Sequence, residues 1–225
     1  MKKALEAYWG DKISAEELLK VAKEQRLNTY ATIKEQGVDF VPTGTFSLYD
    51  HVLDMSNTLG IIPEAYAKSG LSQLDTYFAM ARGHQKGGVD LPATEMKKWF
   101  DSNYHYLVPE FSEKSEFKLN DNKPVDDFIE AKEAGYNARP VILGPLTLLW
   151  LGKTSKDAQD PNFNRYSLLP KLAQTYVQLF EKLAAAGAPW VQLDEPILVG
   201  DTAKQLRNEF KQTYELFHKS VPNLN

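Results

Sequence analysis

Two adjacent carboxylates, Asp194 and Glu195, are the sharpest chemical candidate in the sequence. They follow an apolar segment typical of a buried strand, residues 190–193, and precede Pro196. Two carboxylates about 5 to 9 Å apart can hydrolyse a glycosidic bond, but adjacent strand residues point to opposite faces, so this pair does not flank one bond. We therefore expect at most one of them to face a ligand site and the other to form a salt bridge or cap. A structural role for both stays open.

Four histidines could act as bases or metal ligands, but their spacing does not indicate a metal centre. His51, His84, His105 and His218 include no pair four residues apart beside a carboxylate, and the chain has no cysteine. Thiolate zinc sites, iron–sulfur clusters and cysteine nucleophiles are therefore excluded from these residues. We expect His218 to face solvent and His51 to be structural rather than a base. His105 lies in the aromatic segment 103–106, where a core role is favoured over a substrate contact.

Lysines are the remaining candidates. Lys97 and Lys98 lie in residues 93–100, a predicted short helix, and such pairs usually occupy a solvated face. Together with Lys2 and Lys3 they could receive an anionic ligand, although spacing alone does not indicate one.

Composition limits the class of function. The chain has 26 basic and 30 acidic residues, a formal net charge of −4, and no basic stripe of the kind that nucleic-acid binding requires. It has neither a P-loop nor a dinucleotide-binding glycine motif. No apolar run approaches the ~18 residues that span a bilayer, and the first residues lack the apolar region of a secretory signal. We expect a soluble, cytoplasmic protein that binds neither nucleic acid nor membranes.

The pattern of apolar residues predicts the elements that must position these side chains. Helices are expected at residues 1–9, 14–36, 46–59, 93–100, 126–134, 168–186 and 202–219, and strands at 38–42, 116–119, 139–145 and 190–196. Residues 71–81 are compatible with helix or strand, and residues 83–90 are expected to form a loop. The alternation of strand and helix in the last third is typical of a parallel α/β fold, with polar site residues at strand carboxyl ends.

Stretches in order along nearly the whole chain resemble one known family. They are residues 2–9 (KKALEAYW), 46–53 (FSLYDHVL), 95–106 (EMKKWFDSNYHY), 116–119 (EFKL), 140–145 with 151–153 (PVILGP and LGK), and 191–196 (VQLDEP). By these motifs the chain resembles the N-terminal barrel of the cobalamin-independent methionine synthase family.

The resemblance implies a methyl transfer from 5-methyltetrahydropteroyltri-L-glutamate, a folate polyglutamate, to the sulfur of homocysteine. The family uses two facing (β/α)8 barrels of the TIM type. A zinc ion, held by His, Cys, Glu and Cys in the C-terminal barrel, lowers the pKa of the homocysteine thiol. Lysines of the N-terminal barrel meet the glutamate tail of the folate. The matching motifs assign this role to Lys2 and Lys98, since an ammonium group needs only an open approach to a carboxylate tail.

Departures from the family bear on activity. The first strand, with a Gly-Phe-Pro-Arg-Ile-Gly-type motif, is expected before Lys2, and the last strands of this barrel and the whole zinc barrel are expected after Asn225. The resemblance therefore implies an incomplete (β/α)8 barrel over residues 1–225, with its first strand and last strands missing and no zinc site. We expect these residues to be inactive alone. A stand-alone folate-binding or protein-interaction module without catalysis is the alternative interpretation.

Overall fold

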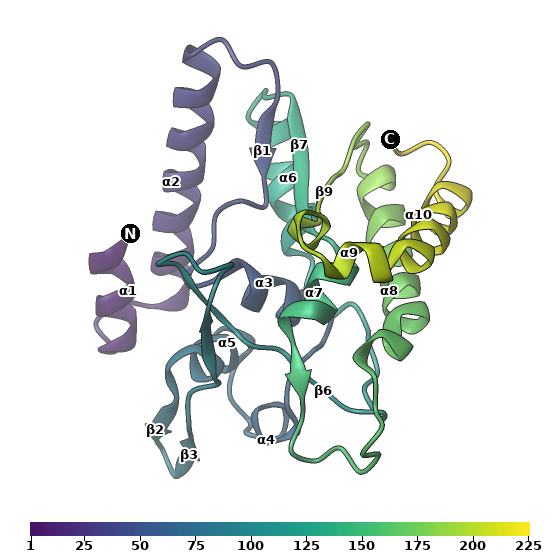
Figure 1. Cartoon of the computed structure of the whole chain (residues 1–225). Coiled ribbons are helices and arrows are strands. Elements are labelled where there is room, and N and C mark those ends of the chain that lie inside the picture. The colour runs from purple at the N-terminus through teal and green to yellow at the C-terminus, as the bar shows by residue number, and fades with distance from the viewer.

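A short parallel sheet lies at the centre of the structure, a computed structural model that describes residues 1–225 (Figure 1). Its strands are β1 (Val41–Thr43), β7 (Ala138–Leu143) and β9 (Gln192–Asp194), in the order β1-β7-β9. Both strand pairs are parallel, and the ends of β7 and β9 coincide, with Leu143 opposite Asp194. The sheet confirms the α/β class with parallel strands, and β1 and β9 form its edges.

Helices lie in the chain segments that connect these strands, because parallel neighbours need long crossover connections. The connection from β1 to β7 contains α3 (His51–Thr58) and α6 (Lys123–Glu133), and the connection from β7 to β9 contains α7 (Pro145–Leu151) and α8 (Leu169–Ala185). The predicted helix at 168–186 corresponds to α8. The sequence does not predict α7, because six of its seven residues are buried and the segment therefore has no polar face.

The main hydrophobic core lies between the sheet and α8. Ile142 of β7 and Leu172 and Tyr176 of α8 are all buried in it. The helix α10 (Arg207–Ser220) covers α8, and its Phe217 ring lies 6.1 Å from the ring of Tyr176. The sheet is thus fixed to a two-helix layer by aromatic and aliphatic packing.

Two helices open the chain and cover a smaller second core. They are α1 (Lys2–Trp9) and α2 (Ala15–Glu35), and Leu18 of α2 is fully buried in the second core. Ser14 and Glu17 form a capping box at the start of α2: the Ser14 hydroxyl accepts from the Glu17 N–H at 3.1 Å, and the Glu17 carboxylate accepts from the Ser14 N–H at 2.7 Å. Reciprocal pairing of this kind satisfies N–H groups that have no partner within the helix, and it confirms the predicted helix start.

A hairpin replaces the loop expected at residues 83–90. It consists of β2 (His84–Lys86) and β3 (Val89–Leu91), which pair antiparallel. Gly87 and Gly88 connect them with φ values of 61° and 81°. Two consecutive positive φ angles give a turn whose twist matches that of the flanking strands, so the glycines expected to mark a loop instead close a hairpin.

A second hairpin shows that the helix predicted at residues 93–100 is wrong. Here β4 (Met96–Lys98) pairs antiparallel with β5 (His105–Leu107). Phe100 and Asp101 follow β4 with φ values of 43° and 59°, a backbone conformation that ends any right-handed helix. Burial of part of β5 against the core holds the paired strand in place.

Two further expectations are corrected. Residues 116–119 form no strand, because no strand lies beside them to pair with; the Lys118 N–H instead donates to the Leu59 carbonyl at 3.2 Å. The helix expected over 46–59 begins only at α3, since the side chain of Asp50 caps that helix.

The remaining elements are short, except for the helix over residues 73–82, which is largely buried in the second core. They are α4 (Glu64–Ala67), α5 (Gln73–Arg82), β6 (Glu110–Phe111), β8 (Lys153–Thr154), the 3-10 helices Arg165–Leu168 and Pro196–Val199, and α9 (Thr202–Gln205). The undecided segment at 71–81 is thus mostly helix, and the helix predicted at 202–219 is divided into α9 and α10. None of the helices combines the length and the apolar character needed to cross a bilayer.

Replacement of Gly44 tests how closely the loop after β1 approaches β7. Gly44 has a φ of 81°, and a Cβ there would lie 2.7 Å from the Val141 carbonyl oxygen; Gly37 has the same φ but open space around it. We expect Gly44→Ala to lower the free energy of unfolding by about 1–3 kcal/mol more than Gly37→Ala, because only Gly44→Ala adds an overlap to the backbone strain. Urea denaturation of both variants measures the difference, and equal losses would contradict the close approach.

Candidate functional site

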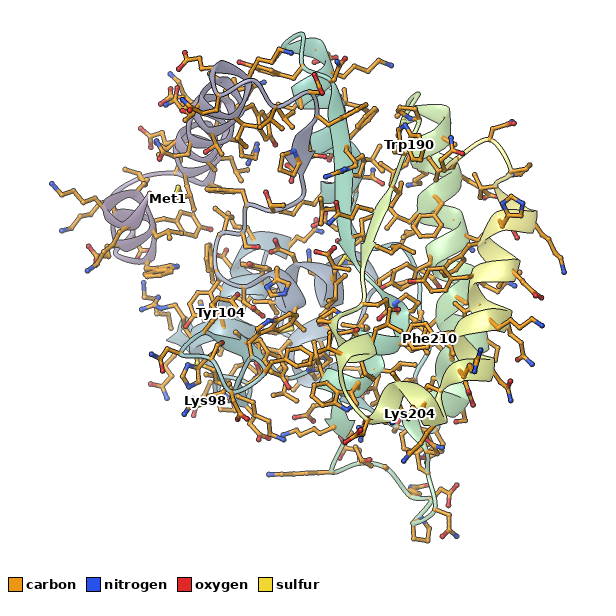
Figure 2. The ribbon with its side chains drawn as sticks, turned by 45° about the horizontal axis from the view of Figure 1, so that its top comes forward. Met1, Lys98, Tyr104, Trp190, Lys204 and Phe210 are labelled. Atoms are coloured by element: carbon orange, nitrogen blue, oxygen red, sulfur yellow. The ribbon has the colours of Figure 1, made fainter.

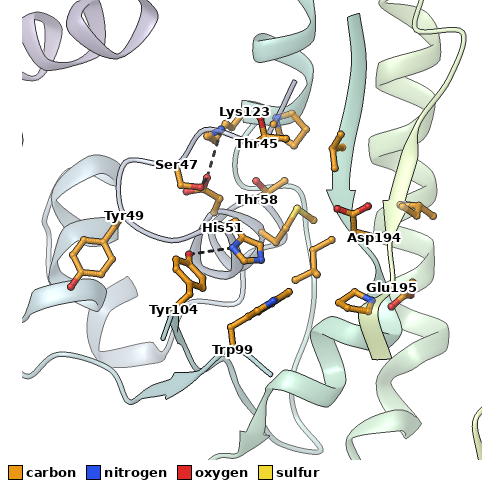
Figure 3. A pocket seen from close by; sticks show the side chains of 18 residues that line it. Thr45, Ser47, Tyr49, His51, Thr58, Trp99, Tyr104, Lys123, Asp194 and Glu195 are labelled. Atoms are coloured by element: carbon orange, nitrogen blue, oxygen red, sulfur yellow. Dashed lines mark hydrogen bonds and ion pairs between the residues drawn. The ribbon is translucent and has the colours of Figure 1, made fainter. Parts of the chain in front are cut away.

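A pocket of about 860 Å³ opens at the carboxyl ends of β7 and β9 (Figure 3). Its wall combines these strand ends with the loop after β1, α3, the start of α6 and the β4–β5 hairpin. The polar side chains that line it are Thr45, Ser47, Tyr49, His51, Asp54, Thr58, Tyr104, Lys123, Asp194 and Glu195. Parallel α/β sheets place ligand sites at this edge, and the volume lies in the range of small-molecule pockets.

The two carboxylates at the end of β9 have different roles, as the alternation of strand side chains predicts. Glu195 is buried, and its two oxygens accept from the N–H groups of Leu146 at 3.1 Å and Thr147 at 2.7 Å. It therefore caps the first turn of α7, where N–H groups lack partners within the helix. Asp194 is exposed at the pocket and accepts from Gln192 Nε2 at 2.8 Å.

Burial raises the pKa of Glu195, although its hydrogen bonds to the start of α7 oppose that shift. The carboxylate thus takes a structural position at the foot of the pocket. Asp194 leaves one oxygen free of any protein hydrogen bond. The geometry thus divides the pair into one residue that faces the pocket, Asp194, and one that caps a helix, Glu195, and a ligand contact of Asp194 stays a prediction.

Alanine substitution distinguishes the two neighbours. We expect Glu195→Ala to lower the free energy of unfolding by about 2–4 kcal/mol, because it leaves two buried N–H groups unpaired. Asp194→Ala removes an exposed carboxylate and should change stability by no more than about 0.5 kcal/mol. Denaturant titration of both variants provides the comparison, and similar losses would show that Glu195 is not the cap that holds α7.

A buried carboxylate organises the opposite wall of the pocket. Asp50 has an exposed fraction of 1%, and its Oδ2 accepts from the N–H groups of Leu53 at 2.9 Å and Leu107 at 3.1 Å. Its Oδ1 accepts from the Tyr104 hydroxyl at 2.6 Å. The Tyr104 oxygen in turn lies 3.2 Å from Nδ1 of His51. One carboxylate therefore fixes the start of α3, the β5 strand and the histidine ring.

His51 lies at the pocket in a mostly apolar, aromatic environment. Its ring centroid is 4.6 Å from that of Trp99 and 5.7 Å from that of Tyr104. Burial lowers the pKa of His51, and the nearby carboxylates of Asp50 and Asp194 partly offset this effect. The imidazole is hydrogen-bonded, as expected of a structural histidine, but it also lines the cavity, which the sequence did not indicate.

The titration of His51 tests this environment. We expect a His51 pKa below 6.5, and a further decrease in Asp194→Asn, because that variant removes one charge that favours the imidazolium. A lowered folded-state pKa also means that stability falls as pH decreases through the interval from 6.5 to the folded-state value, where the unfolded chain binds more protons. NMR titration of the imidazole measures both values; a rise of the pKa in Asp194→Asn would contradict the arrangement.

A buried ion network closes the third side of the pocket. Lys123 donates to Asp127 at 2.6 Å and to the Phe46 carbonyl at 2.8 Å, and its Nζ lies 3.6 Å from Asp54. Burial raises the pKa of Asp54, against the lowering effect of Lys123. For Lys123, burial disfavours the ammonium, but Asp54 and Asp127 outweigh it and raise the pKa. Lys123 and Asp127 lie one turn apart in α6, but Asp54 and Phe46 lie about seventy residues before Lys123, so the sequence does not indicate the network as a whole.

The lysines selected from the sequence lie outside this pocket. Lys2 is exposed and its Nζ is 3.8 Å from Glu6. Lys98 is exposed on β4, where it takes part in no ion pair, whereas Nζ of the neighbouring Lys97 is 3.5 Å from Glu95. Figure 2 shows Met1 and Lys98 on the side of the molecule opposite Phe210 and Lys204. The structure thus leaves both candidate lysines accessible but does not bring them into the pocket.

Two further histidine predictions have clear outcomes. His218 is exposed, as expected. His105 is also exposed, and its Nδ1 lies 3.1 Å from the Asn103 carbonyl. The core role favoured for His105 is therefore wrong, because its side chain lies on the outer face of β5 while that of Tyr106 is buried.

The residues present do not fit a zinc centre. No three His, Cys, Asp or Glu side chains converge on a position that could hold a metal ion. The aspartates around the pocket have different partners: Asp50 binds Tyr104, Asp54 lies beside Lys123, and Asp194 binds Gln192. No step of a reaction is therefore assigned to a metal held by these residues.

The fold and the pocket define an α/β domain with a ligand-sized site at the carboxyl ends of parallel strands. Comparison with known proteins identifies the family: residues 1–225 match the N-terminal domain of the cobalamin-independent synthases, and the chain belongs to this family.

Three relatives of the chain carry one activity in their names. A Schizosaccharomyces pombe protein named "Probable 5-methyltetrahydropteroyltriglutamate–homocysteine methyltransferase" is 50% identical over 97% of the chain. The Saccharomyces cerevisiae and Chelativorans sp. proteins named 5-methyltetrahydropteroyltriglutamate–homocysteine methyltransferase are each 48% identical over 96% of the chain. The chain spans about 29% of the length of these three relatives.

Proposed function

We propose that the chain is the N-terminal part of an enzyme that transfers a methyl group from 5-methyltetrahydropteroyltri-L-glutamate to homocysteine, forming methionine. The family match over residues 1–225 and the names of relatives about half identical to it support this assignment. The reaction takes place in the cytoplasm, as expected for an enzyme of amino-acid biosynthesis, and its substrates are small molecules.

Within that enzyme, these residues form part of a (β/α)8 barrel and scaffold the cleft between two barrels. The parallel order β1-β7-β9, with helices in each connection, supports this architecture. The partner is the C-terminal barrel, to which the zinc ion and the activation of the homocysteine thiol belong. Because residues 1–225 contain no fitting set of metal ligands, they are inactive without that barrel.

The specific contribution of this segment is to bind the glutamate tail of the folate through Lys2 and Lys98. The observation that carries this proposal is the state of Lys98: it is exposed on a short strand and has no carboxylate partner, while its neighbour Lys97 is paired with Glu95. An exposed ammonium without an ion pair is free to meet the carboxylates of a polyglutamate chain. Lys2 is similarly accessible and has only a loose, solvent-exposed contact with Glu6.

Such contacts hold and orient the substrate without taking part in the chemical step. Each ammonium–carboxylate pair in solvent contributes little by itself, but successive pairs along the tail add to one another and tether the folate. The attraction is long-range at low ionic strength and is screened by salt. The tail therefore anchors the methyl donor, and its reactive ring is left to the rest of the enzyme.

Substitution of neighbouring lysines tests the tail contact. We expect Lys98→Ala to weaken binding of the triglutamate form of 5-methyltetrahydrofolate about two- to fivefold at low salt, because one exposed ion pair is lost. Binding of the monoglutamate form should be nearly unchanged. Isothermal titration calorimetry with the two folates gives the ratio of affinities for each variant.

Lys97→Ala is the matched control, since it removes the same group one residue away. It should leave the preference for triglutamate intact. If Lys97→Ala and Lys98→Ala reduce that preference equally, or if neither does, the assignment of Lys98 to the tail is wrong.

A further inference from the structure

The large pocket presents an unpaired carboxylate. Asp194 lines the cavity, is exposed to it and takes part in no ion pair. Its only side-chain hydrogen bond comes from the neutral amide of Gln192. One carboxylate oxygen is therefore available to accept a hydrogen bond from a ligand and to favour a positive charge.

The hydrogen bonds of Tyr104 make His51 a second acceptor in the pocket. The Tyr104 hydroxyl donates its single proton to Asp50, at 2.6 Å, so its oxygen can only accept from Nδ1 of His51. The neutral imidazole then carries its proton on Nδ1, and Nε2 holds a lone pair. Figure 3 shows His51 and Asp194 on facing walls of the pocket.

No free cation in the pocket offsets these acceptors. Lys123 is the one lysine or arginine in the lining, and its ammonium group is engaged by Asp127, Asp54 and the Phe46 carbonyl. A ligand carboxylate or phosphate would thus meet unpaired acceptors and no available cationic donor. The electrostatics select a ligand that donates hydrogen bonds and carries positive charge.

The rest of the lining adds an apolar surface and one unsatisfied hydroxyl. Met55, Trp99, Leu143 and Leu193 line the cavity, and an indole ring attracts cations as well as apolar groups. Thr58 also lines the pocket. Only 1% of its surface is exposed, and its hydroxyl has no hydrogen-bond partner. The hydroxyl oxygen is itself buried, so it is a cost of the fold rather than a contact for a ligand.

We propose that the pocket binds a primary ammonium compound with an apolar or aromatic body, the ammonium donating to Asp194 and to Nε2 of His51. The body of the ligand lies against Trp99 and the aliphatic side chains. This site goes beyond the folate-tail contacts and does not rest on them, because neither Lys2 nor Lys98 lines the pocket.

Phenethylamine and its uncharged analogue 2-phenylethanol test the proposal with the whole chain. Titrations are followed by ¹H–¹⁵N NMR at the Trp99 indole, which reports binding in this pocket. We expect phenethylamine to bind at least about tenfold more tightly than 2-phenylethanol, since only the ammonium forms a charge-assisted hydrogen bond with a carboxylate.

Two Asp→Asn variants test whether the preference for a charged ligand depends on Asp194. Asp194→Asn should abolish the preference for phenethylamine, whereas Asp201→Asn, an equal change at another exposed aspartate, should retain it. Thermal unfolding confirms that each variant is folded.

Equal affinity for the two probes, absence of a Trp99 shift up to the solubility limit, or an unchanged preference in folded Asp194→Asn would overturn the proposal. Loss of folate-tail binding in Lys98→Ala with intact phenethylamine binding would separate this site from the proposed function.

Discussion

The buried carboxylate of Asp50 is the interaction on which the arrangement of the pocket depends. A carboxylate with 1% exposure is tolerated only when its oxygens are paired. Here they accept from the backbone of α3, the backbone of β5 and the hydroxyl of Tyr104. These donors come from segments more than fifty residues apart, so the pairing joins the first helix of the pocket to the β4–β5 hairpin. The start of α3, the orientation of His51 and the position of the aromatic wall follow from it.

A similar constraint acts at the sheet. Glu195 follows β9 directly, and it caps α7, which follows β7. A single carboxylate therefore links two neighbouring strand–helix units at their carboxyl ends. Since a strand alternates its side chains, the position that sends Glu195 into the core sends Asp194 to the cavity. The carboxylate that Asp194 presents to the pocket is therefore a consequence of the contact by which Glu195 attaches the sheet to α7.

Local signals in the sequence predict much of the fold. Ser14 and Glu17 mark the start of α2, and the apolar segments around Ile142 and Leu193 identify two strands of the parallel sheet. The failures occur where tertiary contacts outweigh local pattern. Lys97 and Lys98 resemble an exposed helix face, but β5 pairs with that segment. The Asp54–Lys123 contact links residues with no local relationship, so no sequence pattern could show it, and the role of Asp50 required knowledge of where β5 lies.

The distribution of ion pairs differs between the pocket and the surface, and this difference underlies the two binding roles that we propose. Inside the pocket the ammonium group of Lys123 is paired with two aspartates, whereas the acceptors Asp194 and His51 have no cationic partner. On the surface the balance is reversed, because Glu95 pairs with Lys97 and with Lys153 but leaves Lys98 unpaired. A net charge of −4 therefore does not describe either location. An anionic tail is favoured at the exposed lysine and a cation in the cavity, and since each place repels the other's ligand, the two sites that we propose can coexist without competing.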